Sequence, residues 1–225
     1  MATTMDAAEL ATIEAYDRWA ETYPPVPHNA LMRAEQQAML ALWPDGVAGA
    51  RALDLACGTG RYARLLKDGG AACVVAADLS LGMLQHSRLD GRVRADMMAL
   101  PFAAGAFDIV VSGLAVGHAP QLDRWMGETA RVLRTGGILL YSDFHPDAAR
   151  AGMERSFTDA GGRRHALAHG LFDEADHRAA AAGAGFEVRV LREVRVGREL
   201  CEGSPEFQRR WQGLAVVMVL CLCKT

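Results

Sequence analysis

The chain has 225 residues, of which 51% are hydrophobic and 23% charged, a composition typical of one globular domain with a buried core. Its formal net charge of -3 argues against a nucleic-acid-binding protein, which would normally carry a basic excess. The first residues lack the basic start and apolar run of a signal peptide, and the apolar run at 214–223 is far shorter than the roughly 20 residues of a membrane helix, so neither segment is expected here.

The N-terminal part of the chain predicts two helices. Apolar residues such as Ile13 and Tyr16 follow a helical period over about 6–23. The proline-rich run 24–27 ends this helix, because proline lacks a backbone N–H and restricts the residue before it. A second helix is expected over about 28–42.

Strands and helices alternate through the middle of the chain. Short apolar runs predict five strands, at about 52–56, 73–77, 92–95, 107–112 and 138–142. Helices between them are expected at about 61–67, 81–87 and 121–133. This alternation predicts an α/β fold with right-handed βαβ units and a mainly parallel, doubly wound sheet.

The end of the chain has a different character. Residues 145–171 are polar and rich in arginine and glycine, with no predicted element. A helix follows at about 173–182, and two long apolar runs at 186–196 and 214–223 predict a terminal β-hairpin. A plain doubly wound dehydrogenase domain does not require such a hairpin.

The cysteines indicate a reduced protein. Their number is odd and no pair has the spacing of a zinc or redox motif, so we expect free thiols, no metal site and a cytoplasmic location. The five are Cys57, Cys73, Cys201, Cys221 and Cys223.

A glycine-rich loop follows the first predicted strand, in the sequence Leu53-Asp54-Leu55-Ala56-Cys57-Gly58-Thr59-Gly60. Glycine lets a backbone approach a ligand closely, and ligands bind at the carboxyl ends of parallel strands. The loop also satisfies the nicotinamide fingerprint G-x-G-x-x-G/A, with Asp78 downstream. Asp54 favours a different ligand. An anion is unhelpful beside a pyrophosphate, whereas it suits the sulfonium and ammonium of S-adenosylmethionine. The alternative for Asp54 is a cap that stabilises the turn.

On these motifs the chain resembles the class I S-adenosylmethionine-dependent methyltransferases. The glycine loop matches the family's first motif, and Asp78, which ends VVAAD, matches the acid that binds both ribose hydroxyls. Residues 95–108 match the family's third-strand phrase, and 131–137 match its "RvLrpGG" with threonine in place of proline. The resemblance covers about residues 50–145 well and the rest loosely. It implies a Rossmann-like sheet of seven strands whose last strand is antiparallel, as the terminal hairpin independently suggests.

The resemblance also implies a cofactor site for S-adenosylmethionine, with S-adenosylhomocysteine as product. Asp96 would accept the adenine amino group and Met97 would lie against the ring. The cofactor-binding residues expected on this basis are Tyr16, Asp54, Ala56, Gly58, Gly60, Asp78, Leu79, Met83, Asp96, Met97 and Ser112.

Within the family, the phrase from Tyr16 to Tyr23 resembles the opening of the quinone C-methyltransferases and the malonyl-carrier-protein O-methyltransferases. In those proteins N-terminal helices form a lid, and the tyrosines border cofactor and substrate. The alternative for Tyr16 and Trp19 is an apolar helix face. The implied layout of the single domain is a helical lid at 1–45, a cofactor-binding core at 46–145, a substrate-cover insert at 146–172 and a C-terminal helix and hairpin at 173–225.

Two histidines follow strand ends on the ligand side of the sheet. His118 follows the fourth predicted strand and His145 the fifth. An imidazole of near-neutral pKa could accept a proton from a phenol, amine or activated carbon, and Asp143 could orient it. The alternative is that either histidine only braces its loop. In the insert, any of several arginines could bind a carboxylate or belong to a solvated loop. They are Arg150, Arg155, Arg163 and Arg164.

The expected function is transfer of a methyl group from S-adenosylmethionine to the oxygen, nitrogen or activated carbon of a small molecule, with no nucleic-acid or membrane partner. Three alternatives stay open. They are a carboxyl O-methyltransferase acting on a carrier-bound malonyl thioester, a nicotinamide-dependent oxidoreductase and a non-catalytic S-adenosylmethionine-binding protein. The acceptor and the oligomeric state stay open as well.

Overall fold

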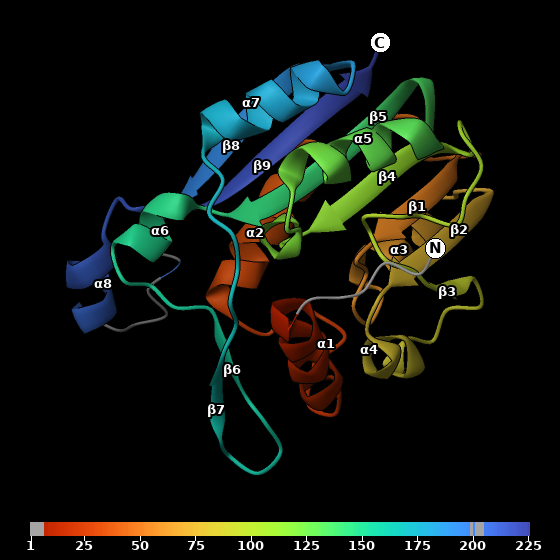
Figure 1. Cartoon of the computed structure of the whole chain (residues 1–225). Helices are drawn as coiled ribbons and strands as arrows, with labels where there is room; N and C mark the ends of the chain where they lie inside the picture. Colours follow the sequence, from red (N-terminus) through yellow and green to blue (C-terminus); the bar gives the residue numbers. More distant parts are fainter. Residues whose placement is uncertain (1–6, 199, 201–204) are drawn as a thin grey trace.

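A seven-stranded sheet with helices on both faces forms the centre of the computed structural model, which describes residues 7–198, 200 and 205–225 (Figure 1). The strand order is β3-β2-β1-β4-β5-β9-β8. The strands are β1 (Arg51–Leu55), β2 (Cys73–Asp78), β3 (Arg92–Arg94), β4 (Phe107–Gly113), β5 (Leu133–Phe144), β8 (Phe186–Arg195) and β9 (Ala215–Lys224). The first five pair in parallel, and β9 is antiparallel to both β5 and β8. The seven-stranded Rossmann-like sheet, its antiparallel last strand and the terminal hairpin are therefore confirmed.

The helices divide between the two faces of the sheet. They are α1 (Ala7–Ala20), α2 (Ala30–Leu40), α3 (Arg61–Asp68), α4 (Leu81–His86), α5 (Leu122–Val132), α6 (Pro146–Arg150), α7 (Glu174–Gly183) and α8 (Pro205–Trp211). Because successive strand residues point to opposite faces, Val110 packs into the core under α5 and α7 while Val111 packs into the core under α2 and α3. Both cores are apolar and buried, as expected for strands covered on two sides.

The insert holds more structure than the sequence indicates. Besides α6, it contains a small antiparallel hairpin of β6 (Ser156–Thr158) and β7 (Arg164–Ala166). Strands of three residues are too short for a period-two pattern, which explains why no strand was predicted. Similarly, β5 is longer than expected, because β4 and β9 pair with it on its two sides.

Helix α1 lies at the edge of the sheet, between α4 and the β6–β7 hairpin (Figure 1). Its Asp17 carboxylate accepts hydrogen bonds from the Ser80 hydroxyl at 2.5 Å and the Gly82 backbone N–H at 2.9 Å, at the start of α4. On its other side, Trp19 stacks on Phe157 of β6 with ring centroids 4.9 Å apart. These contacts hold α1 over the carboxyl ends of β1, β2 and β4.

Four of the five cysteines are free thiols, and Cys201 lies outside the described residues, as do residues 1–6. In the part of the chain that the structure describes, no helix has the length and apolar character needed to cross a membrane.

Candidate active site

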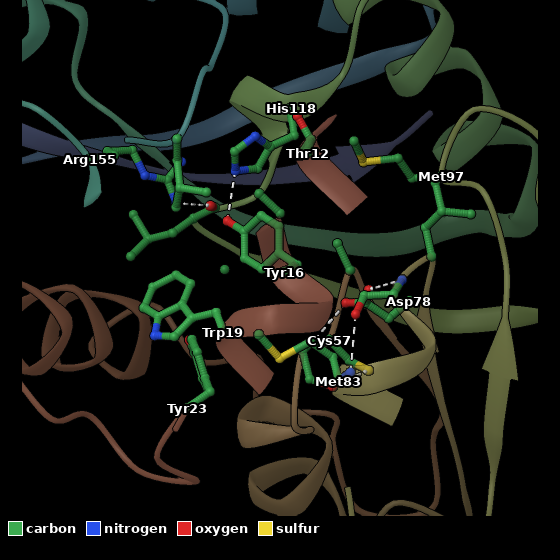
Figure 2. Close-up of a pocket in the computed structure, with 18 of the residues that line it drawn as sticks. Thr12, Tyr16, Trp19, Tyr23, Cys57, Asp78, Met83, Met97, His118 and Arg155 are labelled. Atoms are coloured by element: carbon green, nitrogen blue, oxygen red, sulfur yellow. Dashed lines mark hydrogen bonds between the residues drawn. The ribbon is translucent and has the colours of Figure 1, made fainter. Parts of the chain in front are cut away.

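A pocket of about 310 Å³ lies at the carboxyl ends of β1, β2 and β4, beneath α1 (Figure 2). The sheet supplies its floor, and the segments that flank the β6–β7 hairpin supply one wall through Met153, Arg155 and Leu167. The site is thus where the parallel strands of an α/β sheet present their ligand-binding edge.

The glycine loop turns sharply between β1 and α3. Gly58 and Gly60 have φ values of 55° and 83°, the left-handed region that glycine adopts at little cost. At Gly60 a side chain would also lie 2.5 Å from Leu89. Ala56 has φ 53° without being glycine, and it lines the pocket. Backbone strain of this kind costs about 1–3 kcal/mol and is retained where the surroundings fix the geometry.

Asp54 lies in the pocket wall, and its carboxylate accepts a 2.7 Å hydrogen bond from the Ala63 backbone N–H in α3. Asp54 therefore faces the pocket and also stabilises the turn. Its position is compatible both with a role beside a ligand and with the capping role. Burial raises the pKa of Asp54 to about 7.

Asp78, at the end of β2, joins the glycine loop to α4. One carboxylate oxygen accepts from the Gly58 backbone N–H at 2.7 Å and the other from the Ser80 backbone N–H at 2.8 Å. Burial raises the pKa of this carboxyl group. Each oxygen keeps a second lone pair, so Asp78 can accept two further hydrogen bonds from a ligand.

Most of the expected cofactor residues line this pocket. They are Tyr16, Asp54, Ala56, Gly58, Asp78, Leu79, Met83, Asp96 and Met97. Gly60 and Ser112 do not line it. Gly60 is the N-cap residue of α3, and Ser112 is fully buried inside β4.

His118 also lines the pocket, where its Nε2 atom lies 2.8 Å from the Tyr16 hydroxyl. Its Nδ1 atom lies 3.1 Å from the Ala168 carbonyl oxygen, which can only accept a hydrogen bond, so Nδ1 carries the proton. Nε2 therefore accepts from Tyr16. Burial lowers the pKa of His118 to about 3, so the ring is neutral at physiological pH. Burial raises the pKa of Tyr16 as well.

His145 and Asp143 lie outside the pocket lining, which does not match their expected catalytic roles. Because β5 extends to Phe144, His145 becomes the N-cap residue of α6, where its Nδ1 accepts from the Asp147 backbone N–H at 3.1 Å. Its Nε2 lies 3.3 Å from a Glu193 carboxylate oxygen on β8. The Asp143 carboxylate accepts from the backbone N–H groups of Gly117 and Phe144, and burial raises its pKa to about 6.

Sequence reasoning did not single out a buried acid beside the pocket. Glu35 of α2 has no exposed surface and accepts hydrogen bonds from three side chains. The donors are Tyr62 at 2.7 Å, Arg61 at 2.8 Å and Ser142 at 2.6 Å. Because Arg61 and Tyr62 line the pocket, Glu35 fixes that wall from behind. Its partners lie 26, 27 and 107 residues away in the sequence, so no local motif marks it.

Comparisons with known proteins agree on one family. The family model described as "Methyltransferase domain" matches residues 53–141. The malonyl-[acyl-carrier protein] O-methyltransferase of Geobacter sulfurreducens is 33% identical over 192 residues, covering 79% of this chain and 70% of that protein. The Enterobacter lignolyticus protein of the same name is 37% identical, covering 61% and 55%. The chain spans about half the length of several such curated relatives.

Among solved structures, an S-adenosylmethionine-dependent methyltransferase from Mesorhizobium loti superimposes with a TM-score of 0.69 at 25% identity. The match covers 85% of this chain and 98% of that one.

Proposed function

The chain belongs to the class I S-adenosylmethionine-dependent methyltransferases, and on that premise we propose that it transfers a methyl group from S-adenosylmethionine to a small-molecule acceptor held beneath α1. The single observation that carries the proposal is the geometry of Asp78. Its two carboxylate oxygens are fixed by Gly58 and Ser80, and each keeps capacity for one hydroxyl of a ribose.

The donor set of the pocket fits this cofactor. The carboxylates of Asp54, Asp78 and Asp96 line it together with the apolar side chains of Met83 and Met97, and a fourth lining carboxylate, of Glu154, is paired with Arg164. Carboxylates favour a cationic ligand with hydroxyl and amino donors and disfavour a pyrophosphate. The thioether side chains suit the faces of an aromatic base. We assign the ribose to Asp78, the adenine to Asp96 and Met97, and the methionine part of the cofactor to the side of Asp54 and Tyr16.

When bound, S-adenosylmethionine supplies an electrophilic methyl group on a sulfonium, which an acceptor displaces in line with the departing sulfur. The protein's task is to align the reactants and to exclude water. Helix α1, which Asp17 holds to α4 and Trp19 holds to Phe157, acts as the lid. We assign the cover over the acceptor to the insert that carries β6 and β7. A protonated acceptor would need a base, whereas His118 accepts from Tyr16, so an acceptor that is already anionic suits this site better.

A second candidate has specific support from the relatives. Several are named as O-methyltransferases of malonyl-[acyl-carrier protein], and an acceptor carboxylate needs no base. We therefore propose carboxyl O-methylation of a carrier-bound malonyl thioester as the alternative reaction. The N-terminal lid and the phrase from Tyr16 to Tyr23 are compatible with both candidates.

The test of the proposed function is ligand-dependent stabilisation followed by turnover. S-adenosylhomocysteine at about one hundred times its dissociation constant is expected to stabilise the folded chain by roughly 2.7 kcal/mol, and NADH is expected to have no effect. Stabilisation by NADH alone would favour the oxidoreductase alternative. Release of S-adenosylhomocysteine in a metabolite screen then separates an enzyme from a protein that only binds the cofactor.

A further inference from the structure

Arg155 is a cation in the pocket wall whose hydrogen-bonding capacity is only partly used. Its Nη2 atom donates to the Leu114 carbonyl oxygen at 2.9 Å, which fixes the guanidinium against the end of β4. Its Nη1 atom is buried and has no hydrogen-bond partner among the described residues. A buried polar group without a partner is costly, more so when it is charged, so this donor points to a ligand.

Three other arginines, one in the pocket lining and two in the insert, are paired with acids. Arg61 binds the buried Glu35 carboxylate at 2.8 Å, and Arg150 and Arg164 pair with acids at the surface. Arg155 has no ion pair with a carboxylate in the described ranges 7–198, 200 and 205–225. Its positive charge is therefore not in contact with a carboxylate of those residues, and it interacts with the buried Asp143 carboxyl group only over a longer distance.

The surroundings of Arg155 leave the free donor available to a ligand. The Tyr16 hydroxyl and the His118 ring lie beside it, and the proton of the Tyr16 hydroxyl is directed to His118 while its oxygen faces the guanidinium (Figure 2). The charge of Arg155 also reaches the buried Asp143 carboxyl group and His169. In Figure 2, Arg155 lies across Tyr16 from Asp78 and Met97. The free donor is thus remote from the residues assigned to ribose and adenine, on the side of the pocket that is left for the acceptor.

We propose that Arg155 binds a carboxylate of the methyl acceptor and so selects acceptors that carry one. This inference rests on the proposed function, because it places the acceptor in the same pocket as the cofactor. A monoanion is the better match than a phosphate, since one guanidinium supplies the charge while Asp54, Asp78 and Asp96 line the rest of the pocket. Hydrogen bonds from arginine to a carboxylate are charge-assisted and therefore strong enough to discriminate it from a neutral amide of the same shape.

The first experiment uses the whole chain saturated with S-adenosylhomocysteine. Malonate, succinate and 4-hydroxybenzoate are each compared with the matching amide by thermal shift and calorimetry. At least one carboxylate is expected to bind roughly 10- to 100-fold more tightly than its amide. The proposal is overturned if no carboxylate binds better than its amide in a protein that still binds S-adenosylhomocysteine. Failure to bind S-adenosylhomocysteine would instead overturn the proposed function.

The second experiment assigns the preference to Arg155. Arg155→Gln is expected to bind the best carboxylate and its amide equally, and Arg155→Lys to keep part of the preference through its charge. Arg164→Gln, at an exposed arginine of the same insert, is the matched control and should behave as wild type. A folded Arg155→Gln that keeps the full preference contradicts the assignment.

The same variants distinguish the acceptor's carboxylate from that of the cofactor. Affinity for S-adenosylhomocysteine and for 5′-methylthioadenosine, which lacks the amino-acid carboxylate, is measured for wild type and Arg155→Gln. Both affinities are expected to change less than about twofold, because the cofactor lies elsewhere. A selective loss of S-adenosylhomocysteine binding would mean that Arg155 holds the cofactor's carboxylate and would overturn the proposal. A lower melting temperature with an unchanged carboxylate preference would show a structural role only, which also overturns it.

Discussion

The hydroxyl of Tyr16 donates a hydrogen bond to Nε2 of His118 across 2.8 Å and 102 residues of sequence. The opposite ring nitrogen of His118 donates to the Ala168 carbonyl oxygen, so one neutral imidazole joins α1, the end of β4 and the insert. These three segments enclose the side of the pocket to which we assign the acceptor. His118 is therefore better placed to hold the pocket closed than to accept a proton.

The pH dependence of stability tests this role of His118. Its folded-state pKa of about 3 lies below the ordinary value of 6.5, so between these values the unfolded chain binds a proton that the folded chain does not. Stability is complete above about pH 6.5 and falls as the pH drops toward 3, by at most about 1.4 kcal/mol per pH unit for this residue. In urea unfolding at pH 7, 6 and 5, the free energy of unfolding of His118→Gln should fall less steeply with decreasing pH than that of wild type. If the unfolding free energies of the two proteins fell equally with decreasing pH, the His118 ring would not be held neutral by burial.

Asp78→Asn is expected to weaken S-adenosylhomocysteine binding by roughly 1–3 kcal/mol, because the ribose hydroxyls lose a charged acceptor. The amide oxygen can accept only one of the two backbone N–H groups that Asp78 binds, so a melting curve of the variant is measured beside its affinity. Calorimetry on the variant measures the affinity. Asp108→Asn serves as control, since Asp108 pairs with Arg51 and Arg134 near the surface and does not line the pocket. A folded Asp78→Asn with unchanged affinity would remove this residue from the cofactor site.

Glu35→Ala should cost about 3–5 kcal/mol of unfolding free energy, because it leaves the Arg61 charge and two hydroxyl groups without their buried partner. Gln36→Ala at the next position removes only a neutral acceptor for Arg61 and should cost about 1 kcal/mol. Urea denaturation at pH 7 measures both. Equal losses in the two variants would mean that the buried ion pair adds nothing beyond a neutral hydrogen bond.

His145→Ala is expected to lower the melting temperature without changing the rate of methyl transfer beyond that loss. The imidazole accepts the Asp147 backbone N–H at the start of α6, and losing such a cap costs about 1 kcal/mol. The measurement is a melting curve together with a pH–rate profile on an acceptor identified in the screen. A rate loss of roughly 10²–10⁴ at an unchanged melting temperature would restore His145 as a general base.

The part of the pocket to which we assign the cofactor was predictable because its residues lie at or just after the ends of β1, β2 and β3 in short, ordered motifs. The strands fix the positions of Asp54, Asp78 and Asp96, and each follows from hydrophobic pattern and turn chemistry. The motif at residues 131–137 begins with Arg131, and this arginine has a structural role. Its guanidinium donates to the carbonyl oxygens of Leu100 and Phe102, which joins two of the sequence motifs outside the pocket lining.

The side of the pocket that we assign to the acceptor was less predictable, because the positions of its side chains depend on the residue at which each strand ends. A two-residue extension of β5 takes His145 out of the pocket, and residue spacing alone cannot reveal it. Likewise, nothing in the sequence separates Arg155 from Arg150 or Arg164, which occur in the same polar insert. Only the packing of the β6–β7 hairpin against the pocket turns one of them inward.

The place of β9 in the sheet has a consequence for the order in which the molecule is made. This strand follows β8 in the chain but lies between β5 and β8, so β8 has no neighbour in the sheet until β9 has left the ribosome. Until then, the exposed edge of β5 carries unpaired backbone groups and apolar side chains of the kind that chaperones recognise. The strands β1 to β5 can therefore pair with one another during synthesis, whereas β8 and β9 join the sheet only after translation has passed residue 224.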